Sequence, residues 1–169
     1  DTYLPKLVRA GQRVAICDQL EDPKQTKTIV KRGVTELVTP GVSYNDKILE
    51  NKKNNFLASI HFTKEKLGVA FLDISTGEFF VAEGTADYIL KLIQGFNPSE
   101  VLYEKNRKDD FYELMQDQYY SYRLDDWVFT YEFGSETLLK QFETKSLKGF
   151  GIENMDAAIV AAGSVLHYL

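Results

Sequence analysis

Residues 56–82 read FLASIHFTKEKLGVAFLDISTGEFFVA, and the spacing of the apolar runs in this stretch decides the fold class. Three runs, 56–62, 67–74 and 78–82, are rich in the aliphatic and aromatic side chains that favour β-strands. The two segments that connect these runs are short enough to be hairpin loops. The stretch therefore predicts three consecutive antiparallel strands.

The residues that follow this meander alternate between helix and strand patterns. The expected elements are a helix at 86–96, a strand at 100–103, a helix at 109–115, a strand at 119–124 and a helix at 135–144. Three strands followed by alternating helices and strands is the order of a ribonuclease H-like α/β fold. We therefore expect a mixed sheet with flanking helices, and this expectation concerns fold alone because fold does not fix function.

The two ends of the chain differ from this central part. The first 40 residues predict a small α+β unit, with a helix at 2–10, a strand at 14–17 and a second strand pair at 29–30 and 34–39. Residues 43–55 are polar and rich in charge, which is typical of a domain junction. Residues 153–169 predict a helix that is apolar on nearly all sides, which favours burial in a larger helical body. Both ends look cut, so we interpret the sequence as part of a longer protein.

Composition excludes several classes of protein. With 169 residues, of which 44% are hydrophobic and 27% charged, the chain has globular and not disordered composition. Its single cysteine, Cys17, excludes an internal disulfide framework and fits a reducing cytosol, and we expect this side chain to be buried. No run approaches 18 apolar residues, so a membrane span is not expected. We therefore expect a cytoplasmic protein.

Charge is distributed unequally along the chain. The net charge of −5 combines about +2 in residues 1–40 with about −7 in residues 41–169. Binding to nucleic acid needs clustered positive charge, so the acidic part argues against an independent nucleic-acid-binding module. The candidate nucleic-acid contacts in the first part are Lys24, Lys27, Lys31 and Arg32.

Few residues could carry enzymatic chemistry. The chain lacks the GxxxxGK[ST] loop that cradles nucleotide phosphates, and one cysteine with two distant histidines does not make a Cys/His metal site. The alternative function is a metal-dependent ribonuclease H-like nuclease that uses Asp73 and Glu104 to hold two divalent metals. Against it, the first expected strand contains no acidic residue.

Several motifs, in order, resemble the MutS family of bacterial DNA mismatch repair proteins. They are DTYLPKLVRAG at 1–11, RVAICDQLEDP at 13–23, VTPG at 38–41, LDISTGEF at 72–79, NPSEVLY at 97–103 and GFGIE at 149–153. The resemblance implies three pieces. Residues 1–45 would end the mismatch-recognition domain, 46–150 would form a ribonuclease H-like connector domain, and 151–169 would begin a helical core.

The resemblance also implies a function. The connector would be non-catalytic, would relay state between the DNA-binding and ATPase domains, and would dock the partner protein MutL. No cofactor is expected in this chain; ATP and Mg²⁺, mismatched duplex DNA and homodimerisation would belong to the intact parent. The family's Phe-x-Glu motif, which stacks on the mismatched base, would lie upstream of residue 1.

Two further expectations concern single helices. The letters DFYEL at 110–114 imitate the Phe-x-Glu motif, but they follow the fourth strand, so we expect Phe111 to anchor a helix instead. In the helix expected at 135–144, Leu138, Leu139 and Phe142 should face the core. The opposite face presents Glu136, Thr137 and Lys140, which we expect to contact a partner protein.

Overall fold

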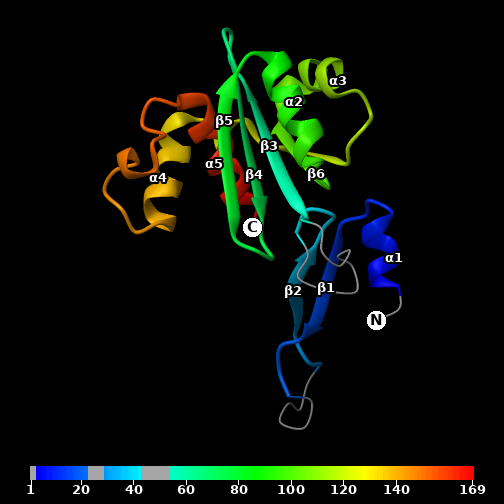
Figure 1. The fold of residues 1–169 in the computed structure, drawn as a ribbon. Helices are drawn as coiled ribbons and strands as arrows, with labels where there is room; N and C mark the ends of the chain where they lie inside the picture. The colour runs from blue at the N-terminus through cyan, green and yellow to red at the C-terminus, as the bar shows by residue number, and fades with distance from the viewer. Residues whose placement is uncertain (1–2, 23–28, 43–53) are drawn as a thin grey trace.

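The computed structural model describes residues 3–22, 29–42 and 54–169. These form an N-terminal module, which comprises the described residues up to 42, and a sheet module, residues 54–169 (Figure 1). The helices are α1 (Leu4–Arg9), α2 (Ala86–Phe96), α3 (Lys108–Met115), α4 (Tyr131–Gln141) and α5 (Asp156–Tyr168), and 3₁₀ turns lie at Lys105–Arg107, Asp126–Val128 and Lys148–Phe150. The strands are β1 (Val14–Gln19), β2 (Arg32–Val38), β3 (Phe56–Phe62), β4 (Leu67–Asp73), β5 (Glu78–Gly84), β6 (Glu100–Glu104) and β7 (Ser121–Leu124).

The N-terminal module is a two-stranded antiparallel ribbon with one short helix. The pairing of β1 with β2 begins at Val14 and Val38 and ends at Gln19 and Arg32. The expected second strand pair at 29–30 and 34–39 is wrong. The structure has one strand here, β2, and its hydrogen-bonding partner is β1. A two-stranded ribbon covers few side chains, so Cys17 is exposed and not buried as expected.

The sheet module has the strand order β5-β4-β3-β6-β7. Strands β3, β4 and β5 form the predicted antiparallel meander, and β6 and β7 run parallel to β3. The expected first strand, 56–62, has the same bounds as β3. The predicted mixed sheet with flanking helices is thus confirmed as a mixed α/β arrangement.

Both faces of this sheet are covered by helices (Figure 1). Phe56, Ala58 and Ile60 of β3 pack with residues of α2 and α3 in one apolar cluster. Leu57 lies in the other cluster, with residues of α4 and α5. Because alternate side chains of a strand point to opposite faces, burial of both faces explains why the strands read as continuous apolar runs.

Helix α5 lies directly against the sheet. Every residue from 157 to 165 is buried, and the Ser59 and Ser164 hydroxyls are 2.6 Å apart between β3 and α5. A Cβ on Gly68 would lie 2.0 Å from the carbonyl oxygen of Ala157, so β4 accepts the helix only because it has glycine there. The apolar surface of α5 is therefore covered by this chain itself. The expectation that it packs in a larger helical body is corrected, while the predicted boundary at residue 151 stays a prediction.

Helix α4 begins four residues before the expected start at Ser135. Thr130 is the N-cap, and its hydroxyl accepts a hydrogen bond from the amide of Phe133 at 3.4 Å. Gly134, a poor helix former, lies inside the helix because α5 needs the space: a Cβ on Gly134 would lie 2.7 Å from the carbonyl oxygen of Ile159. Among the described residues, no helix is long and apolar enough to span a membrane.

Candidate functional site

The two carboxylates of the nuclease alternative lie at opposite ends of β3. Asp73 pairs with Phe56 at the start of β3, whereas Tyr103 pairs with Ile60 near its end and Glu104 follows it. Five residues along a strand separate the two ends by about 16 Å. Two-metal catalysis needs carboxylates that converge on one point, so this pair cannot hold a shared metal pair.

Asp73 has a structural role. Its side chain is fully buried, and one oxygen accepts a hydrogen bond from the amide of Asn55 at 2.9 Å. The other oxygen accepts from the amide of Ser75 at 2.9 Å and from its hydroxyl at 2.6 Å. The carboxylate therefore fixes the β4–β5 turn. In the described part of the chain, no three His, Cys, Asp or Glu side chains are placed to hold a metal ion.

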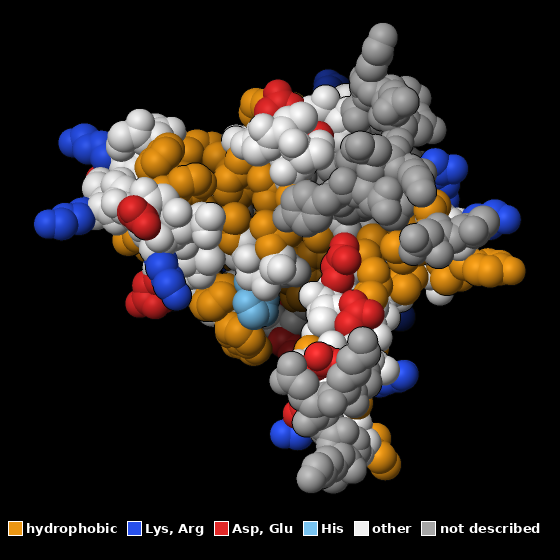
Figure 2. All heavy atoms as spheres, turned by 90° about the horizontal axis from the view of Figure 1, so that it is seen from below, with side chains coloured by type: hydrophobic (Ala, Val, Ile, Leu, Met, Phe, Trp, Pro, Cys, Tyr) orange, Lys and Arg blue, Asp and Glu red, His pale blue; other side chains and the backbone are white. Residues whose placement is uncertain are grey.

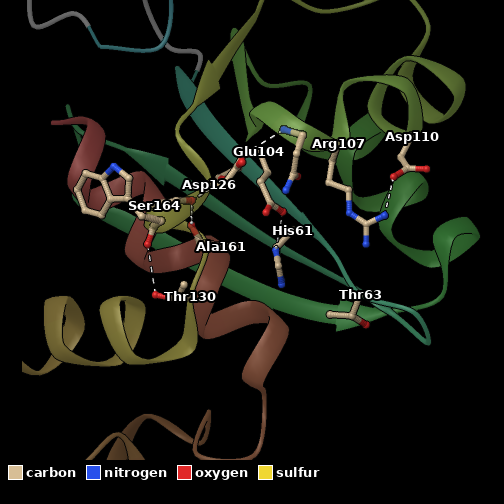
Figure 3. A network of polar contacts seen from close by, with 12 residues as sticks. His61, Thr63, Glu104, Arg107, Asp110, Asp126, Thr130, Ala161 and Ser164 are labelled. Carbon is tan, nitrogen blue, oxygen red and sulfur yellow. Dashed lines mark hydrogen bonds and ion pairs between the residues drawn. The ribbon is translucent and has the colours of Figure 1, made fainter.

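Glu104 lies beside His61 at the carboxyl ends of β6 and β3 (Figure 3). The imidazole Nδ1 is 3.7 Å from Glu104 Oε2, and the ring stacks on Phe129. Burial, helped by the charge of Arg107, lowers the pKa of His61 to about 4. The imidazole is therefore neutral at pH 7, and its contact with Glu104 is not an ion pair at that pH.

The surroundings of this pair also act on the carboxyl group. Burial and the nearby charge of Asp126 raise the pKa of Glu104, while Arg107 opposes the shift. Within the described residues, Nδ1 of His61 is the buried side-chain atom that lacks a hydrogen-bond partner. Both groups therefore favour their neutral forms at this poorly solvated end of the sheet.

The candidate nucleic-acid residues fall partly outside the described chain. Lys24 and Lys27 lie outside the described residues. Lys31 is exposed, and its ammonium lies 3.8 Å from Glu21 Oε1; Arg32 is exposed at the start of β2. On the face shown in Figure 2, Lys and Arg side chains are dispersed, with acidic side chains among them. The assignment of these four residues to nucleic-acid binding stays a prediction.

The candidate partner surface lies on α4. Glu136 and Lys140 are exposed, and Thr137 is half-buried. Leu138 is buried as expected, whereas Phe142 lies just beyond the helix, is 42% exposed and packs against other aromatic rings. The three polar residues thus share the outer part of the helix, and their role in binding a partner stays a prediction.

Phe111 is not available to stack on a base. Its side chain is 1% exposed on α3, and its ring stacks on that of Tyr103 with 4.2 Å between centroids. The expectation that it anchors a helix is confirmed.

A polar site that the sequence analysis missed joins the two modules. Glu100, the first residue of β6, is 2% exposed. Its Oε2 accepts a hydrogen bond from the Thr39 hydroxyl at 2.6 Å and from the Gly41 amide at 3.1 Å. Its Oε1 accepts a hydrogen bond from the Tyr168 hydroxyl at 2.7 Å. We call these four residues the interdomain joint.

An aromatic layer lies next to the interdomain joint. The guanidinium of Arg13 lies 3.6 Å from the ring centroid of Tyr122 and 5.2 Å from that of Tyr168. Burial and the charge of Glu100 raise the pKa of Tyr168, so its hydroxyl keeps its proton and remains a donor. Gly11, with φ of +78°, lies on the ring of Tyr120, where a Cβ would be 2.2 Å from Cε1. The one sequence signal for this site is the charged residue Glu100 directly before the apolar run at 101–103.

Comparison with known proteins covers the whole chain. Residues 1–47 match the family model for MutS domain I, and residues 55–169 match the model for MutS domain II. The chain is 62% identical over all 169 residues to the DNA mismatch repair protein MutS of Cytophaga hutchinsonii and to that of Parabacteroides distasonis. It is 59% identical to that of Bacteroides fragilis. The chain spans about a fifth of the length of these relatives.

Proposed function

Because this chain belongs to the MutS family of DNA mismatch repair proteins, we propose that it is the non-catalytic connector part of such a protein together with the end of its mismatch-recognition domain. One observation carries the proposal: the two domain models match in sequence order and together account for nearly the entire chain. The parent would be a soluble homodimeric ATPase that binds mismatched duplex DNA. ATP and Mg²⁺ would be bound outside this chain, since the residues here offer no phosphate loop.

The fold of the sheet module supports a ribonuclease H-like connector. Three antiparallel strands are followed by two strands parallel to the first, in the order β5-β4-β3-β6-β7. The separation of Asp73 from Glu104 supports a connector that has this topology without nuclease chemistry.

Within this function, the outer face of α4 is the proposed docking surface for MutL. The supporting observation is that Glu136 and Lys140 are exposed on a helix whose other side packs against α5. Charged residues at the rim of an interface affect mainly the association rate, so the test combines two changes near the centre of the face.

The experiment measures binding of MutL to the variant Thr137→Arg/Lys140→Glu. We expect a clear loss of affinity with an unchanged circular dichroism spectrum. The matched control is Gln94→Arg/Lys91→Glu on α2, which makes the same change in net charge on the opposite side of the sheet. Equal affinity of the two folded variants for MutL would place the docking surface elsewhere on the sheet module.

Residual affinity for duplex DNA would come from Lys24, Lys27, Lys31 and Arg32. Contacts of lysine and arginine with phosphates release counterions, so binding should weaken steeply as salt rises. We expect no preference for mismatched over perfect duplex, because Phe111 is buried. Titration of both duplexes at two salt concentrations tests this, and a mismatch preference would contradict it.

A further inference from the structure

We propose that Glu100 is the positioning residue that sets the N-terminal module relative to both the sheet and the end of α5. The inference deepens the proposed relay and rests on it only for its biological purpose. A relay needs contacts through which movement of one module changes the interactions of another. The interdomain joint supplies such contacts, since one carboxylate accepts hydrogen bonds from two modules.

Three properties make Glu100 the centre of the interdomain joint. Its three donors come from segments 61, 59 and 68 residues away in the chain. Both carboxylate oxygens are used, and the side chain is almost wholly buried. A buried charge that loses its partners is strongly destabilising, so the donors must stay together to satisfy it. Displacement of the N-terminal module removes two of the donors at once.

Close packing restricts how the N-terminal module can sit. A Cβ on Gly41 would lie 2.8 Å from Leu57 Cδ1 and 3.0 Å from Glu100 Cβ. The backbone of residue 41 therefore rests on β3 and β6 with no room for a side chain. Hydrogen bonds and packing thus specify one seating of the module on the sheet.

The other end of the coupling is Tyr168, the last residue of α5. Figure 1 places the C-terminus at the end of the sheet from which the N-terminal module extends. Arg13 of the N-terminal module lies over the ring whose hydroxyl donates to Glu100. A rotation at the end of α5 would therefore change the contacts of both Arg13 and Glu100. The N-terminal module and the C-terminal helix are linked through the same few atoms.

The chain contains two residues suited to measuring the position of the N-terminal module relative to the sheet module. Trp127, the single tryptophan, lies in the sheet module, and Cys17, the single cysteine, is exposed on β1. A fluorescent acceptor on Cys17 makes energy transfer from Trp127 a measure of the distance between the modules. Time-resolved donor decay gives the spread of that distance, and the unlabelled form of each variant supplies the donor-only decay.

The variants separate positioning from general stability. Glu100→Ala should broaden the distance distribution and raise the exchange rate of the Gly41 amide by roughly tenfold. Glu100→Gln keeps one acceptor at the same reach, so it should restore most of the wild-type distribution. The control Glu83→Ala removes a carboxylate that accepts from Lys66 and from the Ala157 amide inside the sheet module. It should lower stability without changing the distance.

The outcomes decide the proposal. A folded Glu100→Ala variant with the wild-type distribution would overturn it, as would Glu100→Gln behaving like Glu100→Ala. If Glu100→Ala does not fold, Thr39→Val and Tyr168→Phe remove single donors, and an unchanged distribution in both would overturn it equally. The measurement needs neither DNA nor MutL, so failure of the interdomain joint is distinct from failure of the proposed docking function.

Discussion

At the scale of single residues, the contact between Gly134 and Gly163 determines how closely α4 and α5 approach. The Cβ that an alanine would add at residue 163 meets backbone atoms of residue 134, which cannot rotate away as a side chain could. Overpacking of a close-packed interior typically costs about 1–3 kcal/mol. The two helices therefore leave no room for an added carbon atom at this contact.

We therefore expect Gly163→Ala to lower the free energy of unfolding by about 2 kcal/mol. The matched control is Gly95→Ala in α2, where nothing lies within 4 Å of the added carbon. That change should be neutral or stabilise by up to about 1 kcal/mol, because alanine favours helix over glycine. Urea unfolding of the two variants measures the difference, and equal stabilities would contradict the close helix contact.

His61 makes stability depend on pH. Its pKa in the folded protein is about 4, below the ordinary value of 6.5 that applies to the unfolded chain. As pH falls from 6.5 to about 4, His61 binds a proton in the unfolded chain but stays neutral in the folded protein. The contribution to stability is thus complete above pH 6.5 and is lost progressively toward pH 4, amounting to something on the order of 1–3 kcal/mol.

The variant His61→Phe should remove this part of the acid sensitivity while keeping a ring against Phe129. We expect the difference in unfolding free energy between variant and wild type to grow in favour of the variant from pH 7 to pH 4.5. The control His167→Gln changes an exposed histidine and should leave the acid sensitivity in place. Parallel pH profiles for wild type and His61→Phe would refute the assignment.

At the scale of elements, the start of α4 illustrates where sequence patterns mislead. Tyr131, Phe133 and Gly134 are weak helix formers, and the expected start at Ser135 leaves all three outside the helix. Packing against α5 outweighs this propensity, because Gly134 provides the space the neighbouring helix needs. The strands β3 and β4 were predictable because continuous apolar runs bounded by short polar loops favour buried strands.

The two possible helix starts give opposite expectations for two alanine variants. Thr130→Ala removes the observed N-cap and should lower the unfolding free energy by about 1 kcal/mol. Ser135→Ala lies inside the helix and should be neutral or slightly stabilising. Thermal unfolding distinguishes them, and a larger loss for Ser135→Ala would restore the start at residue 135.

At the scale of the whole molecule, α5 completes the core. Ile159, Val160, Ala161, Ala162 and Val165 belong to the apolar cluster on one face of the sheet. We expect truncation after Gly151 to abolish cooperative unfolding of the sheet module and to expose surface that binds hydrophobic dyes. Calorimetry and dye fluorescence check this, and a cooperative transition in the truncated chain would show that the sheet folds without α5.

The sequence predicted much of the sheet and little of the interdomain joint, for a physical reason. Strand runs are local patterns that any window of the chain reveals. The hydrogen bonds of Glu100 join residues about 60 positions apart, and no local pattern identifies which donors will surround a buried carboxylate. Ser59 and Ser164 illustrate the same limit, since each is one polar residue in an apolar run until the pair is seen together.

The position of α5 after all the strands of the sheet also has a consequence for synthesis on the ribosome. A nascent chain emerges from its N-terminus, so β3, β4 and β6 are released before the helix that covers one of their faces. Until residues 156–168 emerge, Leu57, Leu72 and Leu102 have no helix α5 above them. During this interval that apolar face of the sheet stays uncovered, and the interval ends only after Tyr168 has emerged and can reach Glu100.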